Sequence, residues 1–140
     1  FKTFFNMTST VIYLGALRTE ATHLASSQKL TTDAPKDNQG KGEAFSPTDT
    51  VSTALASCLL TIMGIKARDL NIDLQGTKAE VHKIMGTSPR RITEIKIDIH
   101  FSNSFDDKIK TVLERAARTC PVANSLHPDL KQNLSFIWPD

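Results

Sequence analysis

The segment that decides the fold covers residues 46–70 and reads SPTDTVSTALASCLLTIMGIKARDL. Ser46 can cap a helix, Pro47 suits the first helical position, and Asp49 completes a Ser-x-x-Asp capping box. Apolar side chains then recur every three or four residues, as is typical of a helix: Val51, Ala54, Leu55, Cys58, Leu59, Ile62, Met63 and Ile65. This pattern predicts a central helix that is apolar over most of its circumference and ends near residues 68–70.

Before this helix, the sequence predicts three short strands and a loop. Residues 9–14 (STVIYL) are β-branched and aromatic, as in a strand, and further extended stretches are expected over residues 18–24 and 29–32. Residues 33–45 (DAPKDNQGKGEAF) are rich in Gly, Pro, Asn and Asp and lack periodicity, so we predict a loop. A loop of about a dozen residues is usually functional or disordered.

After the helix, the sequence first predicts a pair of strands. Residues 77–85 are expected to form one strand, and residues 86–89 (GTSP) a turn. In residues 94–101, isoleucine and phenylalanine alternate strictly with polar residues. This alternation predicts an antiparallel strand with one buried face and one wet face.

A second helix, a short helical turn and a last strand complete the prediction. Ser104 is expected to cap the second helix, and Pro121 should end it, because the residue before a proline is disfavoured in helical conformation. Residues 122–126 suit a turn of helix, and residues 134–138 a strand. This order is typical of an α+β fold with two main helices on one face of a mainly antiparallel sheet, and we expect one domain over residues 1–140.

Composition excludes several classes of protein. The length of 140 residues suffices for one domain with its own core. The hydrophobic fraction of 39% and the charged fraction of 23% are ordinary globular values and exclude a disordered or membrane protein. The apolar run at residues 54–65 is interrupted by Ser57, Thr61 and Gly64, so no membrane span is expected. A net charge of +2 without a basic stripe, and only 6% aromatics, argue against a nucleic-acid partner.

Cysteine content and the first residues indicate a compartment. Two cysteines are too few for the disulfide framework of a small secreted domain. The stretch FKTFFNMTST at residues 1–10 has no extended apolar region before a cleavage site, so no secretory signal is predicted. We therefore expect a cytoplasmic protein, in which a cysteine pair more often serves catalysis or redox sensing than structural bridging.

The candidate reactive residues are Cys58 and Cys120. Cys58 lies in mid-helix on the apolar stripe, where it is either a small core hydrophobe or a thiolate that needs a cation from elsewhere in the chain. Cys120 precedes Pro121, where it can cap the next helical segment and meet free N–H groups, or simply pack there. As a pair they could reduce a peroxide, because one thiolate can become a sulfenic acid and the other can condense with it to a disulfide.

Two stretches together resemble the OsmC/Ohr family of osmotically induced and organic-hydroperoxide-resistance proteins: Ser46-Pro47-Thr48-Asp49 through Ala54-Leu55-Ala56-Ser57-Cys58, and Cys120-Pro121-Val122-Ala123-Asn124. The resemblance covers roughly residues 9–138. It implies an OsmC-like fold, an intertwined homodimer with active sites at the subunit interface, organic hydroperoxide as substrate and a dithiol as reductant. It also implies that Cys58 is the peroxidatic cysteine and Cys120 the resolving one.

The resemblance further implies an arginine that stabilises the peroxidatic thiolate. Arg18, in the turn after the first strand, is the best candidate, and its alternative is a solvated surface charge. In the family, a glutamate directly after the helix-start proline holds this arginine, but Thr48 stands at that position here. Asp49 or Glu20 could take its place, or the arginine is held in another way.

Three hypotheses for function follow. The first is a cysteine-based peroxidase, the second a non-catalytic module that binds a small apolar or electrophilic ligand at the dimer interface, which Thr48 favours, and the third a redox sensor. A Cys–His hydrolase dyad of Cys120 with His127 is a weaker alternative. Neither a metal nor a cofactor is expected, since metal-ligand spacing is missing among the four histidines: His23, His82, His100 and His127.

Overall fold

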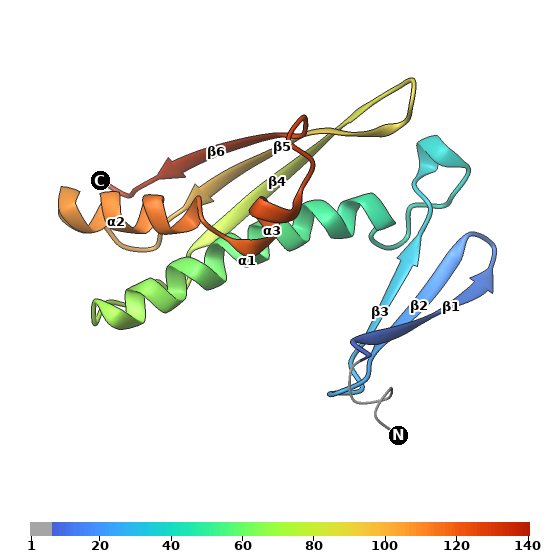
Figure 1. The fold of residues 1–140 in the computed structure, drawn as a ribbon, viewed down its shortest axis with the longest axis horizontal. Coiled ribbons are helices and arrows are strands. Elements are labelled where there is room, and N and C mark those ends of the chain that lie inside the picture. The colour runs from blue at the N-terminus through green and yellow to red at the C-terminus, as the bar shows by residue number, and fades with distance from the viewer. Residues whose placement is uncertain (1–6) are drawn as a thin grey trace. The chain divides into compact units, whose positions relative to one another are not determined.

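The computed structural model describes residues 7–140. The chain divides into two compact units, one ending at Thr50 and the other running Val51–Asp140 (Figure 1). Residues 1–6, and with them most of the stretch on which the missing secretory signal was predicted, lie outside the described residues. The single domain over residues 1–140 stays a prediction.

The N-terminal unit is an antiparallel sheet followed by a loop, as predicted. From residue 7 onward it contains three strands in sequence order and one 3-10 turn: β1 (Ser9–Gly15), β2 (Arg18–His23), β3 (Lys29–Asp33) and η2 (Lys36–Asn38). Arg18 is the first residue of β2 rather than part of a turn. The turn before it holds Ala16 and Leu17 in the left-handed region, with φ of 52° and 63°, which is costly for residues with a side chain.

The loop after β3 is compact. A parallel bridge between Thr32 and Phe45 ties its end to β3. Within the loop, the carbonyl group of Ala34 accepts a hydrogen bond from the N–H of Gly42 (3.1 Å). Gly40 approaches so closely that an added Cβ would lie 1.8 Å from the carbonyl oxygen of Ala34. Because only glycine fits there, this contact fixes the course of the loop.

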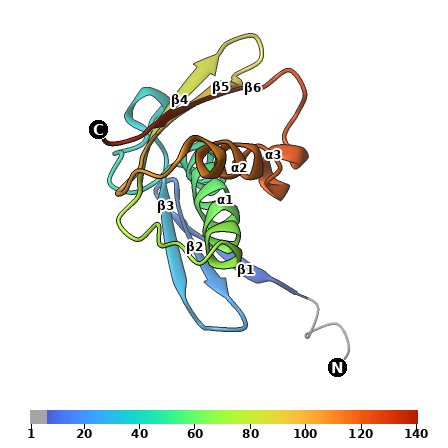
Figure 2. The same cartoon turned by 90° about the vertical axis from the view of Figure 1, so that its left-hand side faces the viewer.

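The C-terminal unit places helices on one face of a second sheet (Figure 2). Its elements include the long helix, which begins at the end of the N-terminal unit: α1 (Pro47–Asp69), β4 (Lys78–Gly86), β5 (Arg91–His100), α2 (Asp107–Ala117), α3 (Pro121–Ser125) and β6 (Lys131–Ile137). Strand β5 is central, antiparallel to β4 and parallel to β6. The parallel pair arises because α2 and α3 carry the chain back before β6 begins. The predicted α+β fold with two main helices is confirmed.

The core of this unit lies between α1 and β5. Fully buried apolar side chains come from both elements and from α2: Leu55, Leu59, Met63, Ile95, Ile97, Ile99 and Leu113. By length and composition alone, α1 is long and apolar enough to cross a membrane, since an 18-residue window of it has a mean hydropathy of 1.5. The fully buried side chains Leu55, Leu59 and Met63 belong to the core of this unit and account for part of this apolar composition.

The helix starts show which capping predictions hold. At α1, Ser46 and Asp49 form the predicted capping box, since the N–H of each donates to the side chain of the other (2.9 and 3.1 Å). At α2, the prediction of Ser104 as cap is wrong. The cap is Asp106, whose carboxylate accepts a hydrogen bond from the N–H of Ile109 (2.9 Å). A carboxylate there also interacts favourably with the positive end of the helix dipole.

Candidate functional site

The structure brings Cys58 and Cys120 together in the core of the C-terminal unit. Cys58 lies in the middle of α1, and Cys120 is the N-cap of α3. Their side chains are hydrogen-bonded to each other, and both thiols are free. Cys120 is fully buried, whereas Cys58 is half-buried and packs against the same core. The pair is therefore formed by two helices that are far apart in the sequence.

Cys120 is held as a neutral thiol. Burial raises the pKa of Cys120 above its ordinary value, because a thiolate is poorly solvated in the core. Hydrogen bonds from the backbone N–H groups of Ala123, 3.3 Å from Sγ, and of Val122 favour the thiolate but do not outweigh burial. The hydrogen bond and the charge of Cys58 raise the pKa further. The N-cap position thus holds the thiol in place without making it acidic.

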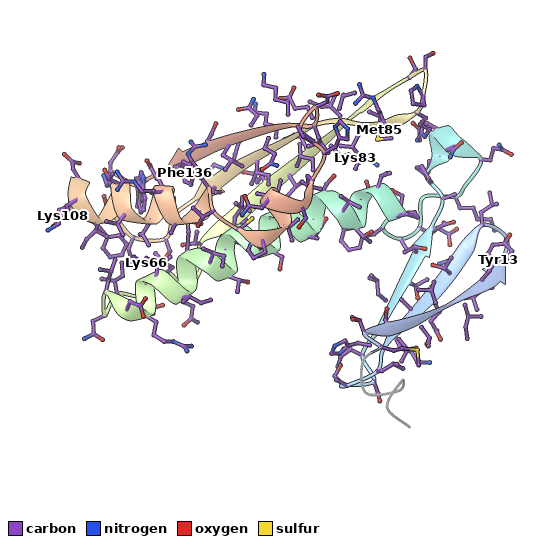
Figure 3. All side chains as sticks on the ribbon, viewed as in Figure 1. Tyr13, Lys66, Lys83, Met85, Lys108 and Phe136 are labelled. Carbon is purple, nitrogen blue, oxygen red and sulfur yellow. The ribbon has the colours of Figure 1, made fainter. Side chains whose placement is uncertain are left out.

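A groove lies between α1, which carries Cys58, and α2, which ends three residues before Cys120. It has a volume of about 460 Å³ and is lined by apolar side chains and by charged or polar ones: Ile62, Ile65, Val112, Ala116, Lys66, Asp69, Arg115 and Thr119. Lys66 projects from the side of α1 that faces α2 (Figure 3). Ile62 follows Cys58 by one helical turn, and Thr119 directly precedes Cys120. This groove can accept a small molecule with an apolar body.

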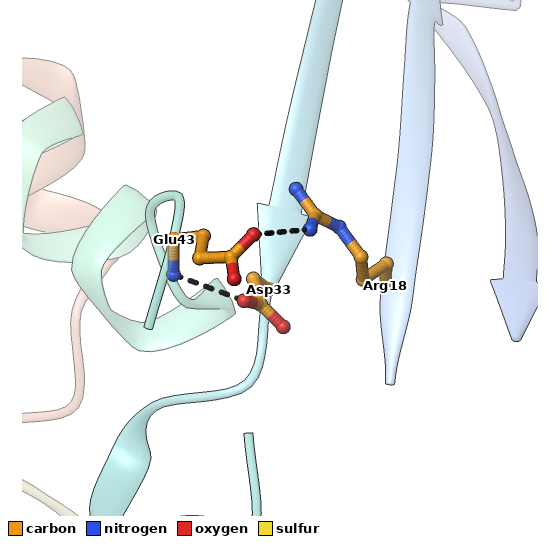
Figure 4. Close-up of polar contacts among 3 residues, drawn as sticks. All are labelled: Arg18, Asp33 and Glu43. Atoms are coloured by element: carbon orange, nitrogen blue, oxygen red, sulfur yellow. Dashed lines mark hydrogen bonds and ion pairs between the residues drawn. The ribbon is translucent and has the colours of Figure 1, made fainter. Parts of the chain in front are cut away.

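In the N-terminal unit, Arg18 is paired with a carboxylate that the sequence did not single out. Its Nη1 donates to Oε2 of Glu43 at 3.0 Å. The backbone N–H of Glu43 in turn donates to Oδ2 of Asp33, also at 3.0 Å (Figure 4). Arg18 and Asp33 are direct partners in the β2–β3 register. These three residues form the polar cluster of this unit.

The two carboxylates that the sequence proposed for Arg18 make other interactions. Asp49 belongs to the capping box of α1. Glu20 accepts a hydrogen bond from Nζ of Lys29 at 3.0 Å. A signal for Glu43 was present, since it is the only glutamate in the loop predicted at residues 33–45. That loop lacks periodicity, however, so its fold could not be predicted.

The remaining candidates form no site. The ring of His127 accepts a hydrogen bond from the N–H of Asp129 (3.0 Å) and is 71% exposed, which gives no support to a dyad with Cys120. His100 is paired with Glu80 on the surface of the sheet, and His23 with Ser26. Within residues 7–140, no group of three His, Cys, Asp or Glu side chains is arranged to hold a metal ion.

Comparisons with known proteins agree on one family. A family model described as OsmC-like protein matches residues 40–135. A crystal structure from Psychrobacter arcticus 273-4, provisionally described as an osmotic stress induced and detoxification response protein, is 56% identical, with a TM-score of 0.91 and coverage of 93% of this chain and 95% of that one. No curated protein matches the chain.

Two more distant structures share the fold alone. The organic hydroperoxide resistance protein OsmC of Legionella pneumophila is 16% identical, with a TM-score of 0.74 and coverage of 94% of this chain and 98% of its own. The OsmC-like protein of Mycoplasma pneumoniae is 23% identical, with a TM-score of 0.75 and coverage of 94% and 96%.

Proposed function

The chain belongs to the OsmC-like family, and on this premise we propose that it is a thiol peroxidase that reduces organic hydroperoxides. The observation that carries the proposal is the contact between Cys58 and Cys120. Two thiols that interact directly are placed so that one can attack the other after oxidation. The Legionella relative is described as an organic hydroperoxide resistance protein, which supports the same substrate class.

The proposed reaction uses one thiol at a time. The Cys58 thiolate attacks the O–O bond of the hydroperoxide, an S–O bond forms, and the alcohol leaves after its oxygen takes up a proton. Cys120 then loses its proton and attacks the Cys58 sulfur, so an S–S bond forms and water leaves. The two thiols supply the two electrons that reduce the peroxide. A dithiol reductant regenerates them by two thiol–disulfide exchanges.

The raised pKa of Cys120 fits the resolving role. A buried, protonated thiol is a poor nucleophile, because the thiolate is the reactive form. Its S–H group can instead donate to the Cys58 sulfur, which is consistent with a hydrogen bond that raises the pKa of Cys120. The two cysteines therefore do not compete for the first attack.

Arg18 is proposed to stabilise the Cys58 thiolate in the assembled active site, with Glu43 as its carboxylate. Glu43 is favoured over Asp49 and Glu20 because its carboxylate accepts a hydrogen bond from the guanidinium, whereas Asp49 caps α1 and Glu20 pairs with Lys29. The threonine at position 48 was the feature that favoured a non-catalytic binding module. Because Arg18 has a carboxylate partner in Glu43, the threonine at position 48 no longer argues for the non-catalytic module.

We propose a homodimer, since OsmC-family proteins are commonly dimers. The N-terminal sheet has an uncovered apolar face, here called the β1 face and formed by Val11, Tyr13 and Leu30. These side chains are 62%, 64% and 43% exposed. Contiguous apolar surface of this kind marks an interaction site, and a second copy of the chain is the proposed partner. We further propose a cytoplasmic location, where dithiol reductants are available, without a membrane or nucleic-acid partner.

Mass spectrometry after one equivalent of cumene hydroperoxide tests the proposed function. We expect a disulfide between Cys58 and Cys120 of one chain, which dithiothreitol reverses. Cys120→Ser should instead retain a sulfenic acid at Cys58 that dimedone traps. Intact thiols in the parent protein would contradict the peroxidase. A disulfide without catalytic turnover in the presence of dithiothreitol would favour the redox-sensor hypothesis.

The pH dependence of disulfide formation is a separate prediction. Cys120 must deprotonate to resolve the sulfenic acid, and burial holds its pKa above the ordinary value. Below that pKa, the thiolate fraction grows about tenfold for each pH unit, so the resolution rate should rise with pH by up to this factor. Rapid quench with acid after oxidation, followed by non-reducing mass spectrometry at several pH values, measures this rate. A rate that falls or stays constant between about pH 6 and pH 8 would contradict the assignment.

A further inference from the structure

Asp33 is a buried carboxylate that the proposed reaction does not use. It is the last residue of β3 and only 1% exposed. Its Oδ2 accepts the hydrogen bond from the N–H of Glu43, whereas its Oδ1 is buried without a hydrogen-bond partner among the described residues. Burying an incompletely bonded carboxylate costs free energy. A structural role in the sheet alone would not require this residue type.

The backbone of Asp33 is fixed from two directions. Its N–H donates to the carbonyl oxygen of Phe45 at 3.0 Å, which holds it against the end of the loop. Across the sheet it is the register partner of Arg18. Side chains of directly opposed residues lie on the same face of a sheet. Asp33 therefore lies between the arginine and the loop segment that carries Glu43.

Glu43 needs such a support because its own side chain is 56% exposed. Ion pairs at an exposed surface are weak, since two long side chains must be held in one geometry and water competes for both. A charge-assisted hydrogen bond from the Glu43 backbone to a buried carboxylate removes part of this freedom before the ion pair forms. The Cα atom of Glu43 is then fixed near the guanidinium of Arg18, and fewer side-chain conformations have to be restricted for the ion pair to form.

We propose that Asp33 is a positioning residue, which anchors the backbone of Glu43 and thereby holds the Glu43 carboxylate on Arg18. The inference rests on the proposed function in one respect, namely that Arg18 acts on the Cys58 thiolate. The anchoring itself concerns only the N-terminal unit. Loss of the Asp33 acceptor should therefore slow alkylation of Cys58 as much as loss of the Glu43 charge does. Both losses together should slow it little more than either one alone.

The test uses the full chain and a set of matched variants. Asp33→Ala removes the acceptor, Asp33→Asn keeps an acceptor oxygen, and Glu43→Gln removes the charge. Thr32→Val is the control, because it removes a neighbouring side-chain hydrogen bond, that of Thr32 with Thr19. If Asp33→Ala does not fold, Asp33→Leu keeps the branched shape without an acceptor. The readouts are hydrogen exchange of the Glu43 amide and the rate of Cys58 alkylation by iodoacetamide across pH.

We expect Asp33→Ala to speed exchange of the Glu43 amide by at least about tenfold, because its hydrogen bond is lost. In Asp33→Ala, the rate of Cys58 alkylation at neutral pH should fall to the rate measured in Glu43→Gln. The curve of alkylation rate against pH should be displaced to higher pH. In the double variant Asp33→Ala/Glu43→Gln, alkylation of Cys58 should be no slower than in either single variant. Asp33→Asn should recover both readouts in large part, and Thr32→Val should leave both near the parent values.

The outcomes separate the inference from the function on which it rests. Unchanged exchange of the Glu43 amide in Asp33→Ala would overturn the positioning role. So would parental alkylation in Asp33→Ala while Glu43→Gln is slow. Faster exchange with parental alkylation in both variants would uphold the anchoring of Glu43 and overturn the role of Arg18 toward Cys58.

Discussion

Cys58→Ser should abolish hydroperoxide reduction, lowering the rate by at least about a thousandfold. A serine hydroxyl is not ionised near neutral pH and cannot form a sulfenic acid, so neither the first attack nor the disulfide step remains. The substitution is nearly isosteric at a half-buried position of α1, so the fold should persist. Consumption of cumene hydroperoxide in the presence of dithiothreitol measures the loss.

Cys120→Ser is the matched variant for this experiment. Because Cys120 is proposed to act after the peroxide bond has broken, this variant should consume its first equivalent of peroxide at a rate close to that of the parent. It should then accumulate sulfenic acid and slow down. A Cys58→Ser protein that consumes peroxide like the parent would refute the mechanism, and a Cys120→Ser protein that fails in the first turnover would refute the division of roles.

Two acidic substitutions on the β1 face should convert the proposed dimer to a monomer. Val11 and Leu30 are both register partners of Ala21, one from each side, and therefore share this face. Burying an unpaired carboxylate against an apolar partner costs about 3–5 kcal/mol, so Val11→Asp/Leu30→Asp should raise the dimer dissociation constant by at least about a hundredfold. Sedimentation equilibrium over a range of protein concentrations measures this change.

Thr10→Asp provides the control for the dimer. Thr10 lies on the same strand, but it pairs with Thr22 and so faces the other side of the sheet. The same charge at this position should leave the dissociation constant close to that of the parent. A parent protein that sediments as a monomer, or an equal effect of Thr10→Asp, would rule out the β1 face as the interface.

Local patterns in the sequence predicted much of this fold. The start of α1 was predictable because Ser46 and Asp49 lie within one helical turn and cap each other. The burial of Ile97 in β5 followed from strict alternation, which reports one buried face directly. Cys120 was predictable as an N-cap because Pro121 restricts the backbone on both sides of the peptide bond.

Features that depend on distant partners could not be predicted in the same way. Alternation in β5 shows which face is buried, but it does not show that β6 pairs with it in parallel. The bond between Arg18 and Glu43 joins positions 25 residues apart, and it depends on a loop held by Gly40 rather than on any periodic signal. The OsmC-like pattern predicts a carboxylate at position 48, whereas the carboxylate that pairs with Arg18 lies five residues earlier in the chain, at Glu43.

The burial of Cys120 also sets how much oxidant the proposed enzyme tolerates. Condensation of its thiolate with the Cys58 sulfenic acid is independent of peroxide concentration, whereas irreversible conversion of that sulfenic acid to a sulfinic acid requires a second peroxide molecule. The fraction of enzyme damaged in each turnover therefore grows with peroxide concentration, and the two processes are equal at one threshold concentration. Because the pKa of Cys120 is raised, acidification slows condensation and lowers this threshold. At a given rate of overoxidation, a larger fraction of the proposed enzyme should therefore be lost in each turnover at acidic pH than at neutral pH.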